Sequence, residues 1–140
     1  MIVIYLAFLH LIADFVLQSR DMGKQKSEKI LVLIQHCCIQ FYVVYGGLLI
    51  TDYPLKQLFY FAATNAIVHG LIDWNIWRVY KSFTTKQVSL GNRKDLVQGA
   101  DQKGNQYRYW DDHYFYLTIG VDQFLHIATL VGLWYVIFGG

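Results

Sequence analysis

The chain has 140 residues, of which 55% are hydrophobic, and its formal net charge at pH 7 is only +2. This length allows one ordinary domain, and so small a net charge gives no reason to expect a nucleic-acid partner. The hydrophobic residues are gathered into long runs, and they are more numerous than a soluble domain of this size needs. The composition therefore favours a membrane protein over a soluble domain.

Four apolar segments follow one another along the chain. They predict an all-α, polytopic membrane protein, a single domain built as a bundle of four transmembrane helices over about 2–18, 30–50, 57–80 and 113–138. A signal peptide is the competing interpretation of the first segment. However, no Lys or Arg precedes that segment, and His10 and Asp14 interrupt its apolar run. We therefore expect a membrane helix there.

The basic residues lie almost entirely on two of the connections between these segments. Eleven of the twelve belong to the first connection or to the third, the polar loop 81–112 with its flanks. They are Arg20, Lys24, Lys26, Lys29, Arg78, Lys81, Lys86, Arg93, Lys94, Lys103 and Arg108. The second connection holds only Lys56. Because Lys and Arg are retained on the cytoplasmic side, we expect the loop 81–112 inside the cytoplasm and both termini outside it.

Three of the segments carry a histidine and an aspartate four residues apart. These pairs are His10/Asp14, His69/Asp73 and Asp122/His126. On a helix this spacing places both side chains on one face. The order is reversed in the last segment, which crosses the membrane in the opposite direction to the first and third, so every pair has its carboxylate nearer the cytoplasm. Ionisable side chains inside a membrane are costly and usually mark function, so the pattern predicts one shared polar site.

Imidazole and carboxylate groups together suit Zn²⁺, Mn²⁺ or Fe²⁺, and helix bundles build such sites from facing helices. We expect a divalent metal, with zinc first and manganese or iron as alternatives. The residues expected to hold it are His10, Asp14, His36, His69, Asp73, Asp122 and His126. The histidines at 10, 69 and 126 are the expected principal ligands. The aspartates Asp14, Asp73 and Asp122 are the expected catalytic residues, as ligands, histidine orienters or the general base.

The alternative is that each pair only hydrogen-bonds neighbouring helices, as polar side chains in membranes do. For one pair this is the simpler interpretation, whereas three pairs in matching orientation favour a common site. Gln18, Gln40 and Gln123 are open to the same two interpretations, because each could orient a ligand or simply bond across helices.

At these residues the chain resembles an uncharacterised membrane family of bacteria and phages, the domain of unknown function numbered 3307. The resemblance rests on the stretch from His10 to Gln18, the histidine of the second segment and the two later pairs. The family often has a second histidine one turn later in the second segment, where this chain has Gln40. The resemblance implies a multi-pass protein of the bacterial cytoplasmic (inner) membrane. The pattern is also distantly similar to membrane-bound metal-dependent hydrolases.

These observations favour a metal-dependent hydrolase that acts on a lipid or a membrane-soluble ester at the cytoplasmic side. Membrane lipid is then the expected partner, nucleic acid is not expected, and an oligomer is allowed. A proton- or ion-translocating protein could use the same cluster. A haem-binding bundle is a third alternative, although a carboxylate beside each histidine disfavours a large apolar ring. The fourth is a membrane partner protein without catalytic activity.

Overall fold

The computed structural model of the protein describes residues 1–89 and 113–139, and within α4 it describes side chains as far as residue 83. The elements are α1 (Ile2–Leu11), the π-helical turn η1 (Ile12–Val16), α2 (Arg20–Gln25), α3 (Ile30–Leu48), α4 (Leu55–Ser89) and α5 (His113–Phe138). The described residues contain no strand. The predicted all-α class is therefore confirmed.

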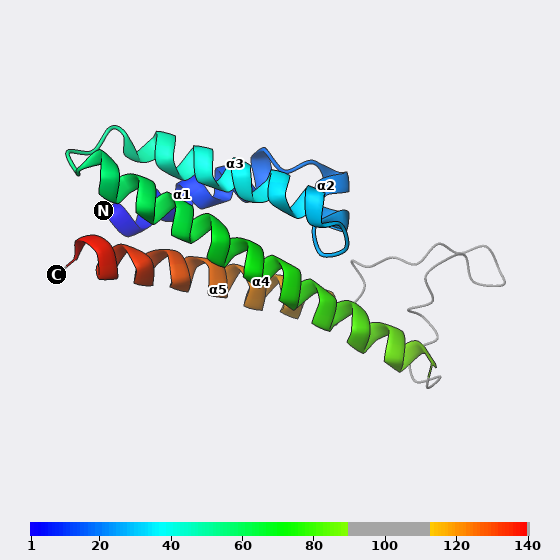
Figure 1. The fold of residues 1–140 in the computed structure, drawn as a ribbon. Coiled ribbons are helices and arrows are strands. Elements are labelled where there is room, and N and C mark those ends of the chain that lie inside the picture. Colours follow the sequence, from blue (N-terminus) through cyan, green and yellow to red (C-terminus); the bar gives the residue numbers. More distant parts are fainter. Residues whose placement is uncertain (90–112, 140) are drawn as a thin grey trace.

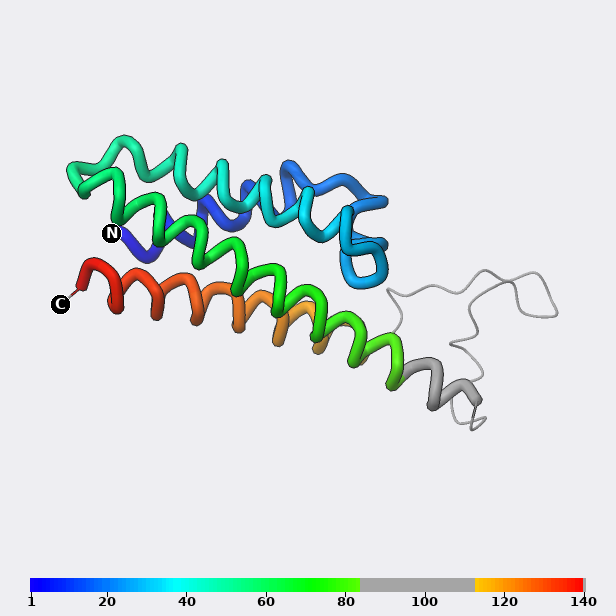
Figure 2. Tube along the Cα trace, viewed as in Figure 1, coloured from blue at the N-terminus to red at the C-terminus, as the bar shows by residue number. Residues whose placement is uncertain are grey.

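The four long elements form a bundle. Helix α4 packs against α3 on one side and α5 on the other, while α1 contacts both α3 and α5 (Figure 1). Both termini lie at one end of the bundle, and α2 lies at the other. Figure 2 shows that the turn from α3 into α4 lies at the end that holds the termini. We call these the terminal end and the α2 end.

The helix boundaries differ from the predicted segments in two places. The first segment ends as a helix at Val16, and Ser19 then begins α2, where its hydroxyl accepts a hydrogen bond from the Met22 backbone N–H at 3.1 Å. Helix α4 continues to Ser89. The prediction that a loop covers 81–112 was therefore wrong for residues 81–89, which are helical. Residues 90–112 of that loop lie outside the described part of the chain.

The helices differ in their capacity to cross a membrane. By length and composition, α3 and α5 are long and apolar enough, whereas the apolar stretch Ile2–Val16 is shorter. These two are the helices that meet this test among the described residues. The structure thus supports two candidate spans, and the predicted four crossings remain a prediction.

A hydrophobic core fills the terminal end of the bundle. Its buried residues are Leu6, Leu9, Val44, Leu48, Leu58, Phe61, Ala62, Leu130 and Trp134. Helix α1 approaches α3 closely at Gly47, where an added Cβ would clash with the Leu9 side chain. In the same place the Tyr5 hydroxyl donates a hydrogen bond of 2.7 Å to the Gly47 carbonyl. A glycine at this position therefore allows α1 to pack into the bundle.

The α2 end of the bundle has a polar interior. Buried side chains here include His36, His69, Asp73, Asp122 and His126, and each is at most 2% exposed. Large apolar side chains instead cover the outside of the long helices. Examples are Ile4, Leu31, Ile67, Phe124 and Val136. At this end of the bundle the interior is therefore polar, although large apolar side chains are exposed on the outside of the helices.

Candidate metal centre

The three His/Asp pairs converge in the polar half of the bundle, together with His36 from α3. Each pair faces inward from its own helix because four residues make about one helical turn. Asp14 lies in η1, where the backbone N–H of Leu17 bonds to the carbonyl of Ile12 at 3.0 Å, a five-residue spacing. Such π-turns occur frequently at functional sites because they alter the direction of the side chains. The structure therefore brings the predicted residues into one cluster.

Four of these residues direct one ligand-capable atom each toward a common point: Asp14, His36, His69 and Asp73. The Nε2 of His36 lies 2.8 Å from Nε2 of His69, 3.0 Å from Oδ1 of Asp14 and 3.3 Å from Oδ2 of Asp73. The Nε2 of His69 lies 3.1 Å from that same Asp73 oxygen and 3.7 Å from the Asp14 oxygen. Five of the six edges of a tetrahedron are thus between 2.8 and 3.7 Å.

These edges fit a tetrahedral metal ion. Zinc binds nitrogen and oxygen ligands at roughly 2.0–2.1 Å, which makes the edge of an ideal tetrahedron about 3.3 Å. The contacts are difficult to explain by hydrogen bonds alone, since one imidazole nitrogen carries either one proton or one lone pair. Yet Nε2 of His36 has three close partners within this group. Two imidazoles with two carboxylates also form a donor set suited to zinc, manganese or iron.

A second group of ligand-capable atoms comes from Asp14, Asp122 and His126. The Nε2 of His126 lies 3.6 Å from Oδ2 of Asp122 and 3.5 Å from Oδ1 of Asp73. This nitrogen and Oδ1 of Asp122 are buried and have no hydrogen-bond partner in the described part of the chain. Asp14 belongs to both groups, so two neighbouring cation positions share one carboxylate.

His10 belongs to neither group, although it lies against both. Its Nδ1 is 3.5 Å from the amide nitrogen of Gln40, and its Nε2 is 3.2 Å from Oε1 of Gln123. Since an amide nitrogen only donates and an amide oxygen only accepts, these contacts assign the ring proton to Nε2. Gln123 also donates to Oδ2 of Asp14 at 2.9 Å. The expected principal ligand His10 is thus a neighbour of the ligand groups in this structure.

Each of the three glutamines was expected either to orient a ligand or to form a hydrogen bond between helices. Gln123 bonds to Asp14 and also lies 3.2 Å from Oδ2 of Asp122, so it orients carboxylates. Gln40 orients His10 across the α1–α3 contact. Gln18 makes no such contact with an aspartate or histidine of the cluster, and its buried Oε1 has no hydrogen-bond partner among the described residues.

Lys26 is a residue of the buried cluster that the sequence analysis did not predict. It is only 3% exposed, and its Nζ lies 2.8 Å from Oδ1 of Asp73, 3.3 Å from Oδ1 of Asp14 and 3.4 Å from Nε2 of His36. Burial lowers the pKa of Lys26, but the charges of Asp73 and Asp14 more than offset this and raise the pKa above its ordinary value. The sequence offers no signal for this role, because Lys26 is one of four basic residues in a polar connection.

The segment that carries Lys26 is attached to α4. The Ser27 carbonyl accepts a hydrogen bond of 2.9 Å from Nε of Arg78, and the Ser27 hydroxyl lies 2.9 Å from Nζ of Lys81. Lys81 also pairs with Glu28 at 2.6 Å, and this hydrogen bond and charge lower the pKa of the exposed Glu28 carboxyl. These contacts hold the polar connection over the end of the bundle, with Lys26 directed inward.

The buried charges of the cluster do not balance. Three carboxylates, Asp14, Asp73 and Asp122, face one ammonium, Lys26, which leaves two formal negative charges if the histidines are neutral. Uncompensated buried charge is strongly unfavourable. A single divalent cation supplies the missing charge, so the composition of the cluster fits a metal as well as its geometry does.

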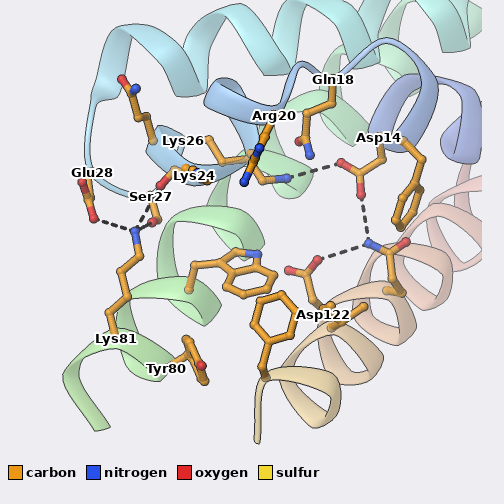
Figure 3. Close-up of a pocket in the computed structure, with 17 residues that line it drawn as sticks. Asp14, Gln18, Arg20, Lys24, Lys26, Ser27, Glu28, Tyr80, Lys81 and Asp122 are labelled. Carbon is orange, nitrogen blue, oxygen red and sulfur yellow. Dashed lines mark hydrogen bonds and ion pairs between the residues drawn. The ribbon is translucent and has the colours of Figure 1, made fainter. Parts of the chain in front are cut away.

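A cavity of about 630 Å³ connects the cluster with the α2 end of the protein. Its inner wall contains Asp14, Asp122 and Gln123, and its outer wall contains residues of α2 and of the segment that follows it. Figure 3 shows Arg20, Lys24 and Lys26 on one side of this space, with Tyr80 and Asp122 on the other. A small molecule could therefore reach the second ligand group from this end.

The fold and the site together define an all-helical protein with a buried His/Asp/Lys cluster that could hold a metal ion. Over residues 2–139 the chain matches the family described as "Protein of unknown function (DUF3307)", and it belongs to that family. No curated protein and no solved structure matches the chain. The function must therefore be inferred from the site itself.

Proposed function

We propose that the chain is an integral membrane protein that crosses the bacterial inner membrane four times. The support is the distribution of side chains, because many large apolar residues of the long helices are exposed while the His/Asp cluster is inside. In lipid this distribution is favourable on both counts, whereas in water it would leave extensive apolar surface exposed. The positive-inside rule then places the α2 end in the cytoplasm and both termini outside it.

We propose further that the cluster binds a divalent metal, with zinc first, and that the protein hydrolyses a phosphoryl or acyl ester. The observation that carries this proposal is the group Asp14, His36, His69 and Asp73, in which five of the six distances between ligand-capable atoms fit a tetrahedral ion. Bound there, a metal would lower the pKa of water and polarise the oxygen of the ester. Manganese and iron are the alternatives for the same ligands.

The chain's own residues have separate roles in this proposal. Asp122 lines the cavity and has an unpartnered buried oxygen, so it is placed to accept a proton from the attacking water. Lys26 lines the same cavity, and its ammonium can stabilise negative charge that develops on the ester. Gln123 holds Asp122 and Asp14 in position through its amide nitrogen.

The apolar core disfavours the alternative of proton or ion translocation. A proton or ion pathway needs polar access to the cluster from both sides of the membrane. Here the cavity reaches the cluster from the α2 end, while Leu6, Val44, Leu48 and Phe61 are fully buried at the terminal end. A cavity that reaches the cluster from the α2 end suits an enzyme that takes its substrate from that side.

The proposal is tested by the metal content of full-length protein purified in detergent without chelators. We expect about one zinc, or another divalent ion, per chain in the unmodified protein. His69→Ala should lose the metal, because this residue supplies one corner of the tetrahedron. The matched control is His113→Ala, since His113 is exposed at the start of α5 and outside both ligand groups.

Activity is measured on the same preparations with phosphate and acyl ester lipids in mixed micelles. Hydrolysis should disappear on chelation, return on addition of zinc and be absent from His69→Ala. A metal-free unmodified protein, or equal metal content in both histidine variants, would overturn the metal centre. Metal without hydrolysis of either ester class would overturn the hydrolase.

A further inference from the structure

The outer wall of the cavity carries cationic groups without partners. Arg20 and Lys24 both line the cavity, are exposed, and make no side-chain hydrogen bond or ion pair within the described part of the chain. The indole N–H of Trp77, on the opposite wall, is buried and likewise lacks a partner there. Two positive charges and one buried donor therefore face the same space, and none of the three has a side-chain partner among the described residues.

The remaining wall of the cavity is apolar and reaches the surface of the bundle. Phe15 from η1, and Phe115 and Ile119 from α5, line it together with the ring of Trp77. Phe15 is 57% exposed, so the apolar wall continues to the outside of the protein beside the mouth of the cavity. Cationic groups next to an apolar surface are suited to an anionic amphiphile rather than to a fully soluble anion.

We infer that this cavity binds the phosphate headgroup of a membrane lipid. The phosphate lies between Arg20, Lys24 and the Trp77 N–H, and the acyl chains leave along Phe15 toward the bilayer. The inference rests on the proposed function, for which it names the substrate class, because it places a phosphate ester beside the second ligand group. A guanidinium can bind two phosphate oxygens at once, so Arg20 suits a phosphate group.

Phosphatidic acid is the probe for this site. Full-length protein in detergent micelles is titrated against a fluorescent phosphatidic acid, with fluorescence anisotropy as the readout. Phosphatidylcholine with the same chains and inorganic phosphate serve as competitors. The test variant is Arg20→Gln/Lys24→Gln. The matched control is Lys29→Gln/Lys56→Gln, which removes the same charge from exposed residues that do not line the cavity.

The two cavity cations should contribute about 1 kcal/mol each, so the double variant should bind phosphatidic acid on the order of thirtyfold more weakly. The control variant should bind as the unmodified protein does. Trp77→Phe, which keeps an apolar ring and removes the N–H, should also weaken binding. Unlabelled phosphatidic acid should displace the probe at far lower concentration than either competitor.

Equal weakening in the two double variants would overturn the inference, because general surface charge would then explain binding. Displacement by inorganic phosphate at the concentration of the lipid would also overturn it, since the lipid would not be the recognised ligand. The metal content of Arg20→Gln/Lys24→Gln separates this outcome from failure of the metal centre. Neither residue belongs to a ligand group, so the variant should keep its metal whatever its lipid affinity.

Discussion

The Nζ of Lys26 lies 2.8 Å from Oδ1 of Asp73, which joins the polar connection before α3 to the interior of α4. The other oxygen of the same carboxylate faces His36 and His69 at 3.3 and 3.1 Å. Asp73 therefore divides its two oxygens between a fixed ammonium and the proposed metal position. Nζ of Lys26 also lies 3.3 Å from Oδ1 of Asp14 and 3.4 Å from Nε2 of His36, so the ammonium directly adjoins the proposed metal position. The stability of the protein should depend on both cations.

Replacement of Lys26 by methionine should destabilise the protein strongly. Removal of one member of a buried charge pair leaves the other uncompensated and typically costs about 3–5 kcal/mol. Thermal and chemical unfolding in detergent, after removal of metal by a chelator, measures the effect. Lys29→Met is the control, because Lys29 is exposed and three residues away. Similar stability of the two variants would show that the Lys26 contacts do not matter.

Gln123→Ala should weaken metal binding without removing a ligand. Gln123 orients Asp14 and Asp122 through contacts of 2.9 and 3.2 Å, and loss of such an orienting group typically lowers metal affinity about 10- to 100-fold. Competition with a zinc-binding dye measures the affinity. Gln57→Ala serves as the control, since Gln57 is exposed at the start of α4. An unchanged affinity in Gln123→Ala would assign this residue to helix packing alone.

Two adjacent glycines in α3 should respond in opposite ways to alanine. At Gly46 an added Cβ meets nothing within 4 Å, so alanine should stabilise the helix by up to about 1 kcal/mol. At Gly47 the same atom would clash with the buried side chain of Leu9, and overpacking of this kind costs about 1–3 kcal/mol. Unfolding of the two variants in detergent provides the comparison. The packing of α1 on α3 would be incorrect if Gly47→Ala were as stable as Gly46→Ala.

The membrane orientation can be tested with reporter fusions. A reporter that is active only in the cytoplasm should be silent after Gly140 and active after Lys29, because the basic connections lie opposite the termini. Protein level in the membrane fraction is the control for each fusion. A strong signal after Gly140 would reverse the proposed orientation, and the cavity would then open on the other side of the membrane.

The helical class and the three inward-facing pairs could be predicted from the sequence alone. Four-residue spacing is a local property of the helix, so His69 and Asp73 share one face whatever the rest of the chain does. The reversed order of Asp122 and His126 likewise follows from chain direction, and it correctly predicted that the pairs would meet. Apolar composition also predicted the long helices, although α4 extends beyond residue 80 to Ser89.

The membership of each ligand group and the inward position of Lys26 depend on how the helices pack, so they could not be predicted from the sequence. Helical periodicity defines a face but does not specify its exact rotation or what a connecting segment contacts. His10 bonds to Gln40 and Gln123 and is outside both ligand groups because of how α1 packs against α3 and α5. Lys26 reaches Asp73 because Ser27 is bound to α4, a contact between residues 51 positions apart. Contacts of this range depend on the packing of the whole bundle, so no local pattern in the sequence encodes them.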